Sequence, residues 1–330
     1  LEGESNGPLG SKQGQVDSEI LQPLVELYRS LDSNRKNRGA LEVETIEPLF
    51  IFNEEKKIER VEARQRNDAH KIIEECMIAA NVAAAETLSE GEYPAVYRNH
   101  DKPDSEKLDV LRQFLADLGL PAKFSEPPSP ESVALVLRMA KQRPDREMIE
   151  TMILRSLKLA VYSAENNGHF GLALQSYCHF TSPIRRYPDL VVHRALKNRR
   201  ARKRQTAVAS AELGEVADWC SLTERRAEEA SRDVISWLKC EFMHDKIGDE
   251  FEGFISGVTN FGIFVTLRDV FVEGLIHVTA LPEDYYHYDE VRHTLSGERS
   301  RHAYKIGEAL NVRVTGVSMA ERKIDFELCG

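Results

Sequence analysis

Apolar residues in the N-terminal part of the chain recur mostly at helical spacing. Residues 16–36 carry leucine and tyrosine side chains three or four positions apart, which predicts an amphipathic helix. Residues 40–64 alternate between apolar and polar side chains, so this segment predicts two or three short strands. The segment 66–90 returns to the helical period, and Asn67 or Asp68 is its expected N-cap.

The helical pattern continues, with interruptions, as far as residue 244. Further helices are predicted within 105–160, where the proline-rich stretch EPPSPE at 126–131 must break them. Another long helix is predicted over 212–244. Pro183 occupies a natural first position of a helix, so we expect a helix to begin there.

The period changes to that of strands just after residue 246. Five candidate strands follow, namely DEFEGFISGV, GIFVTL, VEGLIHV, NVRVTGV and KIDFEL. Five strands of this size predict a small Greek-key barrel. We therefore expect a polar, flexible linker at 1–15, an α+β domain over 16–246 and an all-β domain over 247–330.

Composition narrows the class of protein without fixing its activity. The net charge is −10, which argues against a protein that coats nucleic acid through bulk positive charge. The five cysteines are widely spaced without a CxxC pair, so we expect reduced thiols of a cytoplasmic protein and no zinc site. No apolar run is long enough to span a membrane. The basic run at 197–205 either guides an anionic polymer or forms a solvated charged loop.

The densest group of polar residues lies in the run from Gly168 to Leu196, GHFGLALQSYCHFTSPIRRYPDLVVHRAL. Arg185 and Arg186 stand beside hydroxyl-bearing residues, and such a set suits a phosphate. The alternative is a helix N-terminus with ordinary capping and two exposed arginines. Spacing alone does not decide between the two.

Three blocks of the sequence together resemble a known family. HFGLALQSY followed by HFTSPIRRYPDLVVHRAL, RNDAHKIIEECMIAANVAAAE at 66–86 and VYRNHDKP at 96–103 resemble the catalytic domain of the ribonuclease II/R exoribonucleases, also called the RNB type. VYRNHDKP and the C-terminal barrel favour the ribonuclease R branch. The resemblance implies part of an RNB catalytic domain, with helices around an incomplete sheet. It also implies a five-stranded OB-fold barrel of the S1 type.

The activity that the resemblance implies is processive 3′→5′ hydrolysis of RNA to nucleoside 5′-monophosphates, in RNA degradation and quality control. Single-stranded RNA and 3′ overhangs would be the substrates, and aspartates spaced as D-x5-D-x-D-D would hold Mg²⁺. This sequence contains no such cluster. We therefore expect the metal ligands to lie upstream of a C-terminal fragment that, alone, is inactive and does not bind Mg²⁺.

Two other interpretations remain open. The chain could be a non-catalytic RNA-binding or adaptor module with a degenerate RNB fold. It could also be one piece of a nicked enzyme whose N-terminal part stays bound. In each case we expect a cytoplasmic monomer.

The resemblance also implies roles for particular residues of the RNB part. Arg185 would contact the scissile phosphate as a catalytic residue, and Arg186 would bind RNA. Either Glu74 or Glu75 would face the RNA path, with the other expected as a solvated helix residue. The remaining candidates are Tyr177 and His179, which would stack on bases or pack, and His100, which we expect in the core.

This chain departs from the family on the late helix. The family has a glutamate before an R-D-V sequence, where this chain has Ser231. Glu228 or Glu229 could replace it from the preceding turn.

In the barrel, the resemblance implies an RNA-stacking platform of Phe261, Phe264 and His277, with Arg322 as an adjacent cation. The alternative is that both phenylalanines fill the barrel core. At strict strand period the two would face opposite sides, and a bulge at Gly262 would turn both outward. Near the last strand, where the family often has an acidic residue, this chain has Ser318.

Overall fold

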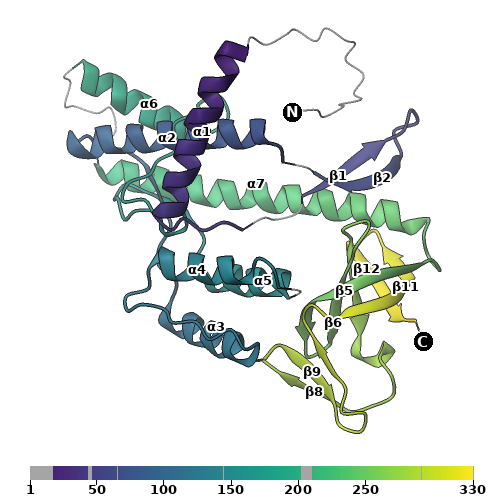
Figure 1. Ribbon diagram of the computed structural model, residues 1–330. Helices are drawn as coiled ribbons and strands as arrows, with labels where there is room; N and C mark the ends of the chain where they lie inside the picture. The colour runs from purple at the N-terminus through teal and green to yellow at the C-terminus, as the bar shows by residue number, and fades with distance from the viewer. Residues whose placement is uncertain are drawn as a thin grey trace.

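A 35-residue helix, α7 (Ser210–His244), connects the helical part of the molecule to its barrel (Figure 1). At 1.5 Å per residue it is about 50 Å long. This computed structural model describes residues 18–43, 47–64, 66–143, 145–201, 210–290 and 292–329. The predicted linker at 1–15 and part of the basic run at 197–205 lie outside the described residues.

The predicted helices form with their expected ends in most places. The other helices are α1 (Ser18–Asn37), α2 (Asp68–Glu90), α3 (Ser105–Asp117), α4 (Pro130–Ala140), α5 (Arg146–Ser156) and α6 (Tyr187–Arg200). Asn67 is the N-cap of α2, where its side chain accepts from the His70 backbone N–H while the His70 ring accepts from the Asn67 N–H. Ser129 caps α4, directly before Pro130 at the first helical position.

Two small antiparallel sheets accompany these helices. Strands β1 (Pro48–Phe52) and β2 (Ile58–Ala63) form the hairpin predicted within 40–64. Strands β3 (Tyr97–Asn99) and β4 (Val161–Ser163) pair across the long segment that contains α3, α4 and α5. This second pair brings the VYRNHDKP block close to the signature run, because β4 leads directly into it.

The five predicted barrel strands form one closed sheet. They are β5 (Glu250–Thr259), β6 (Gly262–Leu267), β7 (Glu273–His277), β11 (Ala309–Ser318) and β12 (Lys323–Leu328), in the order β11-β12-β7-β6-β5. Ile263, Val265 and Leu267 of β6 are fully buried and alternate with partly exposed neighbours. The fold is therefore α+β with an OB-like five-stranded barrel, as the sequence predicts.

A third small sheet, which was not predicted from the sequence, lies between β7 and β11 in the chain. Strands β8 (Tyr286–Asp289), β9 (Thr294–Gly297) and β10 (Ala303–Lys305) pair antiparallel. They are three or four residues long and mostly polar, so they carry no clear alternation. The Asp284 carboxylate holds the returning turn by accepting from the backbone N–H groups of Arg299 at 2.9 Å and Ser300 at 2.8 Å.

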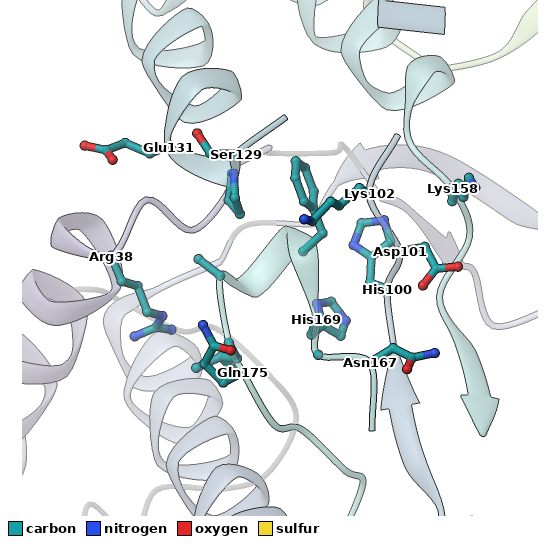
Figure 2. Close-up of a pocket in the computed structure, with 15 residues that line it drawn as sticks. Arg38, His100, Asp101, Lys102, Ser129, Glu131, Lys158, Asn167, His169 and Gln175 are labelled. Carbon is teal, nitrogen blue, oxygen red and sulfur yellow. The ribbon is translucent and has the colours of Figure 1, made fainter. Parts of the chain in front are cut away.

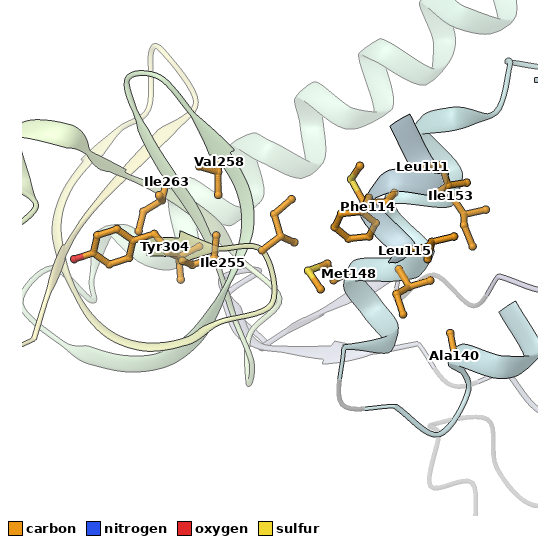
Figure 3. Close-up of a cluster of buried hydrophobic side chains, with 14 of the residues drawn as sticks. Leu111, Phe114, Leu115, Ala140, Met148, Ile153, Ile255, Val258, Ile263 and Tyr304 are labelled. Carbon is orange, nitrogen blue, oxygen red and sulfur yellow. The ribbon is translucent and has the colours of Figure 1, made fainter. Parts of the chain in front are cut away.

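The barrel shares a hydrophobic core with the helices α3, α4 and α5 (Figure 3). Leu111 and Phe114 of α3 and Met148 of α5 belong to the same buried cluster as Ile255 of β5 and Tyr304 of β10. Fully burying one such side chain contributes roughly 1.5–3 kcal/mol. The shared core fixes the barrel against the helices, so sites on the two parts keep a defined spacing.

Candidate functional site

The loop before α6 carries the two arginines of the signature run, and one carboxylate holds it. Asp189 lies in the first turn of α6 and has no solvent exposure. Its Oδ1 accepts from the Ser182 backbone N–H at 2.7 Å and from Arg186 Nη2 at 2.8 Å. A buried carboxylate with these two donors fixes the path of the loop.

The predicted start of this helix is wrong by four residues. The helix α6 begins at Tyr187, and Pro188 rather than Pro183 lies in its first turn. Pro183 belongs to a separate turn, in which the Arg186 N–H donates to the Ser182 carbonyl at 3.0 Å. The backbone of Arg186 is extended, with φ −121° and ψ 118°, and this interrupts the helical path between the two prolines.

The two arginines have opposite environments. Arg186 is tied to Asp189 and is largely covered. Arg185 is exposed, and no acceptor among the described residues hydrogen-bonds or ion-pairs with its guanidinium. The structural ion pair therefore belongs to Arg186, while Arg185 remains available for a ligand.

A cavity of about 530 Å³ lies beside this loop, lined by α2 and the signature run. Four of the candidates named from sequence line it: Glu74, Tyr177, His179 and Arg186. Asn81 of α2 joins its two walls, because its amide donates to the Tyr177 hydroxyl and accepts from the Phe180 N–H, both at 2.9 Å. Asn81 therefore clamps α2 to the signature run.

Tyr177 contributes only its edge to the cavity. It is 7% exposed and makes edge-to-face contacts with His169 and His179. A base cannot stack on a ring that is covered in this way, so the structure favours the packing interpretation for Tyr177.

Glu74 and Glu75 of α2 differ in exposure and in their ion-pair partners, and not in the way expected. Glu75 is 4% exposed and its Oε1 lies 2.7 Å from Arg35 Nη1 of α1. Glu74 is partly exposed, lines the cavity and pairs with Arg66. The expectation that one of the two is a solvated helix residue is wrong, because Glu75 is buried in an ion pair that joins α1 to α2.

A second polar network, which the sequence analysis missed, supports the cavity from α7. Arg98 Nη1 donates to Glu224 Oε2 at 2.6 Å, and its guanidinium lies 4.6 Å from the centre of the Tyr162 ring. The Tyr162 hydroxyl lies 2.8 Å from His179 Nδ1 and 3.4 Å from Glu224 Oε1. The late-helix glutamate in this network is thus Glu224, one turn before the Glu228 considered from sequence.

Histidines with little solvent exposure surround these networks in the neutral state. The pKa of His169 is lowered to about 3, mainly by burial and to a smaller extent by His100 and Arg98. Burial likewise lowers the pKa of His179 to about 3, with Arg186 and Arg98 adding to the effect. His100 is 8% exposed and its Nδ1 accepts from the Gly171 N–H at 2.9 Å, as expected of a core residue.

These shifts predict that the folded state loses stability in mild acid. The unfolded histidines titrate near 6.5, so below that pH the unfolded chain binds protons that the folded chain refuses. The histidine contribution is complete above pH 6.5 and declines toward pH 3, by roughly 1 kcal/mol per histidine for each pH unit. Urea unfolding between pH 7.5 and 5 should show this decline, and a His179→Asn variant should show a shallower one. Equal slopes would contradict the prediction.

Another cavity, of about 730 Å³, is lined in part by the first residues of the signature run (Figure 2). Arg38, Lys102 and His169 lie around it, and the Arg38 Nε donates to the Leu172 carbonyl at 2.9 Å. Lys158 at its edge is paired with Asp104 at 2.7 Å. Of the candidates named from sequence, His100, which was expected in the core, lines this cavity.

The barrel cavity, in contrast, contains all four residues predicted there. Phe261, Phe264, His277 and Arg322 line a space of about 580 Å³. The two phenylalanine rings meet edge to face with centroids 6.1 Å apart, and Phe261 is 45% exposed. Neither ring fills the barrel core, so the alternative of core packing is wrong.

Phe261 and Phe264 both face outward, but a bulge at Gly262 is not the cause. Phe261 lies in the turn before β6 and so escapes the strand period, while Phe264 lies on the outer face of β6. The register shift between β5 and β6 occurs at Ile255–Gly257. Gly262 is needed for another reason, because a Cβ there would lie 2.3 Å from the Ile276 carbonyl oxygen.

Two further expectations concern the edge of the barrel. Arg322 pairs with Asp233 of α7, with Nε and Oδ1 3.2 Å apart, and its Nη1 donates to the Met319 carbonyl at 2.6 Å. Ser318 Oγ accepts from the Glu321 N–H at 3.3 Å and so closes the turn between β11 and β12. Arg322 therefore borders the platform while its charge is already paired.

Across the described ranges, no three histidine, cysteine, aspartate or glutamate side chains are grouped as metal ligands. The described residues therefore do not fit the Mg²⁺ site that the resemblance implies. No helix in the described part of the chain has the length and apolar character to cross a bilayer.

Comparisons with known families and proteins agree with one another. The RNB domain model matches residues 4–200, and the S1 RNA binding domain model matches residues 244–328. Ribonuclease R of Escherichia coli K12 is 50% identical over 318 residues, covering 93% of this chain and 39% of that protein. Ribonuclease R of Thermotoga maritima is 38% identical over 327 residues, covering 97% of this chain and 46% of that protein.

A solved structure gives the same result. Mycoplasma genitalium RNase R in complex with ribose-methylated single-stranded RNA matches with a TM-score of 0.88 at 27% identity, over 94% of this chain and 49% of that one. The chain thus spans less than half the length of these relatives.

Proposed function

The chain belongs to the RNB domain family and carries an S1 RNA binding domain, and on this premise we propose that it is the RNA-holding part of a 3′→5′ exoribonuclease. Its relatives are ribonucleases R, so an exoribonuclease of this family fits the chain. The longer enzyme would hydrolyse single-stranded RNA and 3′ overhangs processively to nucleoside 5′-monophosphates. We place it in the cytoplasm as a monomer.

One observation carries this proposal: Arg185 is exposed, has no partner among the residues that the structure describes, and lies on a loop that a fully buried aspartate holds in place. A free guanidinium on a rigid support can bind a phosphate without a large loss of side-chain entropy. Donors placed in advance near the scissile group stabilise the charge that develops during hydrolysis. Arg186 holds the loop by pairing with Asp189, and Arg185 binds the phosphate of the RNA.

The carboxylates that would bind Mg²⁺ are not found in this chain's described residues. Hydrolysis by two Mg²⁺ ions requires clustered carboxylates. The described residues offer no such cluster. We therefore propose that aspartates outside this chain supply the metal site, and that the chain alone binds RNA without cleaving it. The possibility of an N-terminal part bound as a separate piece stays within this proposal.

Binding of RNA by the isolated chain tests the proposal. Fluorescence anisotropy should show tighter binding of a 5′-labelled 20-nucleotide single strand than of a blunt duplex of the same sequence. We expect at least a tenfold difference, because stacking on the barrel requires unpaired bases, and each stacked base contributes about 1–3 kcal/mol. Equal affinity for both, or no binding of the single strand, would refute the assignment.

A further inference from the structure

The RNA-binding cavity of the barrel is not built by the barrel alone. Phe261, Phe264 and His277 form one side, and Ser236 and Lys239 of α7 form the other. The helix and the barrel are also joined at this point by the ion pair between Asp233 and Arg322. The cavity is therefore a composite of two parts of the molecule that are far apart in sequence.

Three cationic side chains of lysine or arginine line this cavity, and two of them are already paired. Arg322 pairs with Asp233, and Lys323 Nζ lies 2.8 Å from Glu321 Oε2. Lys239 has no hydrogen-bond or ion-pair partner among the described residues, although it is only partly exposed. Its charge is the one in this cavity that a ligand can use.

The surroundings of Lys239 leave its charge poorly compensated. Burial lowers the pKa of its ammonium group, and the carboxylate of Glu273 opposes this at longer range. Glu273 is itself engaged, because it accepts from Ser256 Oγ at 2.6 Å. A partly desolvated cation without a contacting anion is stabilised when an anionic ligand enters.

The aromatic side of the cavity indicates which anion this is. The exposed face of Phe261 and the outward face of Phe264 suit a nucleobase. A nucleotide that stacks there carries its phosphate a few ångströms from the base, across a cavity of about 580 Å³. An isolated phosphate would use Lys239 without using the rings, whereas an RNA strand uses both.

We propose that Lys239 binds a backbone phosphate of single-stranded RNA whose base stacks on Phe261 and Phe264. This deepens the proposed function and rests on it. The same helix carries Glu224 at the network behind the signature run, 15 residues before Lys239. At 1.5 Å per residue the two positions are about 22 Å apart along a continuous helix, so RNA held at the barrel keeps a fixed distance from the signature run.

The salt dependence of RNA binding measures this contact directly. Binding of a 5′-fluorescein-labelled decauridylate by the whole chain is measured by anisotropy over a series of NaCl concentrations. Each phosphate contact contributes about −0.7 to the slope of log K against log salt for a single strand. Lys239→Ala and Lys239→Gln should both lose about 0.7 of slope and bind several-fold more weakly. Lys239→Arg should keep the slope.

Two controls separate the inference from the proposed function. Lys305→Ala removes an exposed lysine of β10 outside the cavity and should leave slope and affinity unchanged. Phe264→Ala should weaken binding while keeping the slope. If Lys239→Ala behaves like Lys305→Ala while Phe264→Ala weakens binding, the inference is wrong and the proposed function stands. If the wild-type chain does not bind decauridylate, the proposed function fails and the inference fails with it.

Melting temperatures show whether the Lys239 variants bind RNA more weakly only because they are less stable. Removing a partly buried charge that has no partner among the described residues should not lower the melting temperature, so circular dichroism should show Lys239→Ala and Lys239→Gln melting no earlier than wild type. A weaker affinity at unchanged slope would overturn the inference, because it would mean that the lost contact is not one with phosphate.

Discussion

Replacing Arg185 with alanine in the longer exoribonuclease that we propose is expected to lower kcat by roughly 100- to 1000-fold, the usual effect of losing one positioned donor to developing charge. The reason lies in the contrast between the two arginines of the loop. Arg185 is exposed and without a partner among the described residues, so its removal disturbs no contact of the fold. The melting temperature of the variant should therefore equal that of wild type.

Two matched variants sharpen this expectation. Arg185→Lys keeps the charge without the planar fork that binds two phosphate oxygens, so it should restore only part of kcat. Arg186→Ala should instead lower the melting temperature, because it leaves the buried Asp189 carboxylate without its cation. Nearly full activity in Arg185→Ala, or a loss that follows its melting temperature, would contradict the assigned roles.

The second large effect is on stability, at Asp189. Asp189→Ala is expected to lower the free energy of unfolding by about 3 kcal/mol, since it strands a covered guanidinium and the buried Ser182 N–H. Asp189→Asn keeps one acceptor for Ser182 and should cost less. Urea denaturation at pH 7.5 measures both, and Asp218→Ala, on the exposed side of α7, is the control. If Asp189→Ala unfolds like this control, the carboxylate does not hold the loop.

Local patterns predicted the elements that carry a strong period. The helices α1, α2 and α7 and the five barrel strands follow from the spacing of apolar residues and from caps such as Asn67. The three strands β8, β9 and β10 escaped because they are short and polar and depend on a carboxylate, Asp284, that reaches across the turn. A pattern read along the chain does not contain such a contact.

The candidate site could be predicted only in part, for the same reason. The signature run identified Arg185 and Arg186, yet it could not say which of them pairs with Asp189. The clamp by Asn81 and the network of Arg98, Tyr162 and Glu224 join residues far apart in sequence. Lys239 carried no signal at all, because its significance arises only where α7 packs against the barrel.

We expect this chain to bind RNA without cutting it, because its described residues offer no cluster of carboxylates for Mg²⁺. The decisive measurement is hydrolysis of a 5′-labelled single-stranded RNA in the presence of Mg²⁺, with binding of the same RNA followed by anisotropy. Retained binding and no shortening of the RNA are expected. A ladder that shortens from the 3′ end, and that disappears in Arg185→Ala, would contradict it and would mean that the chain is catalytically complete.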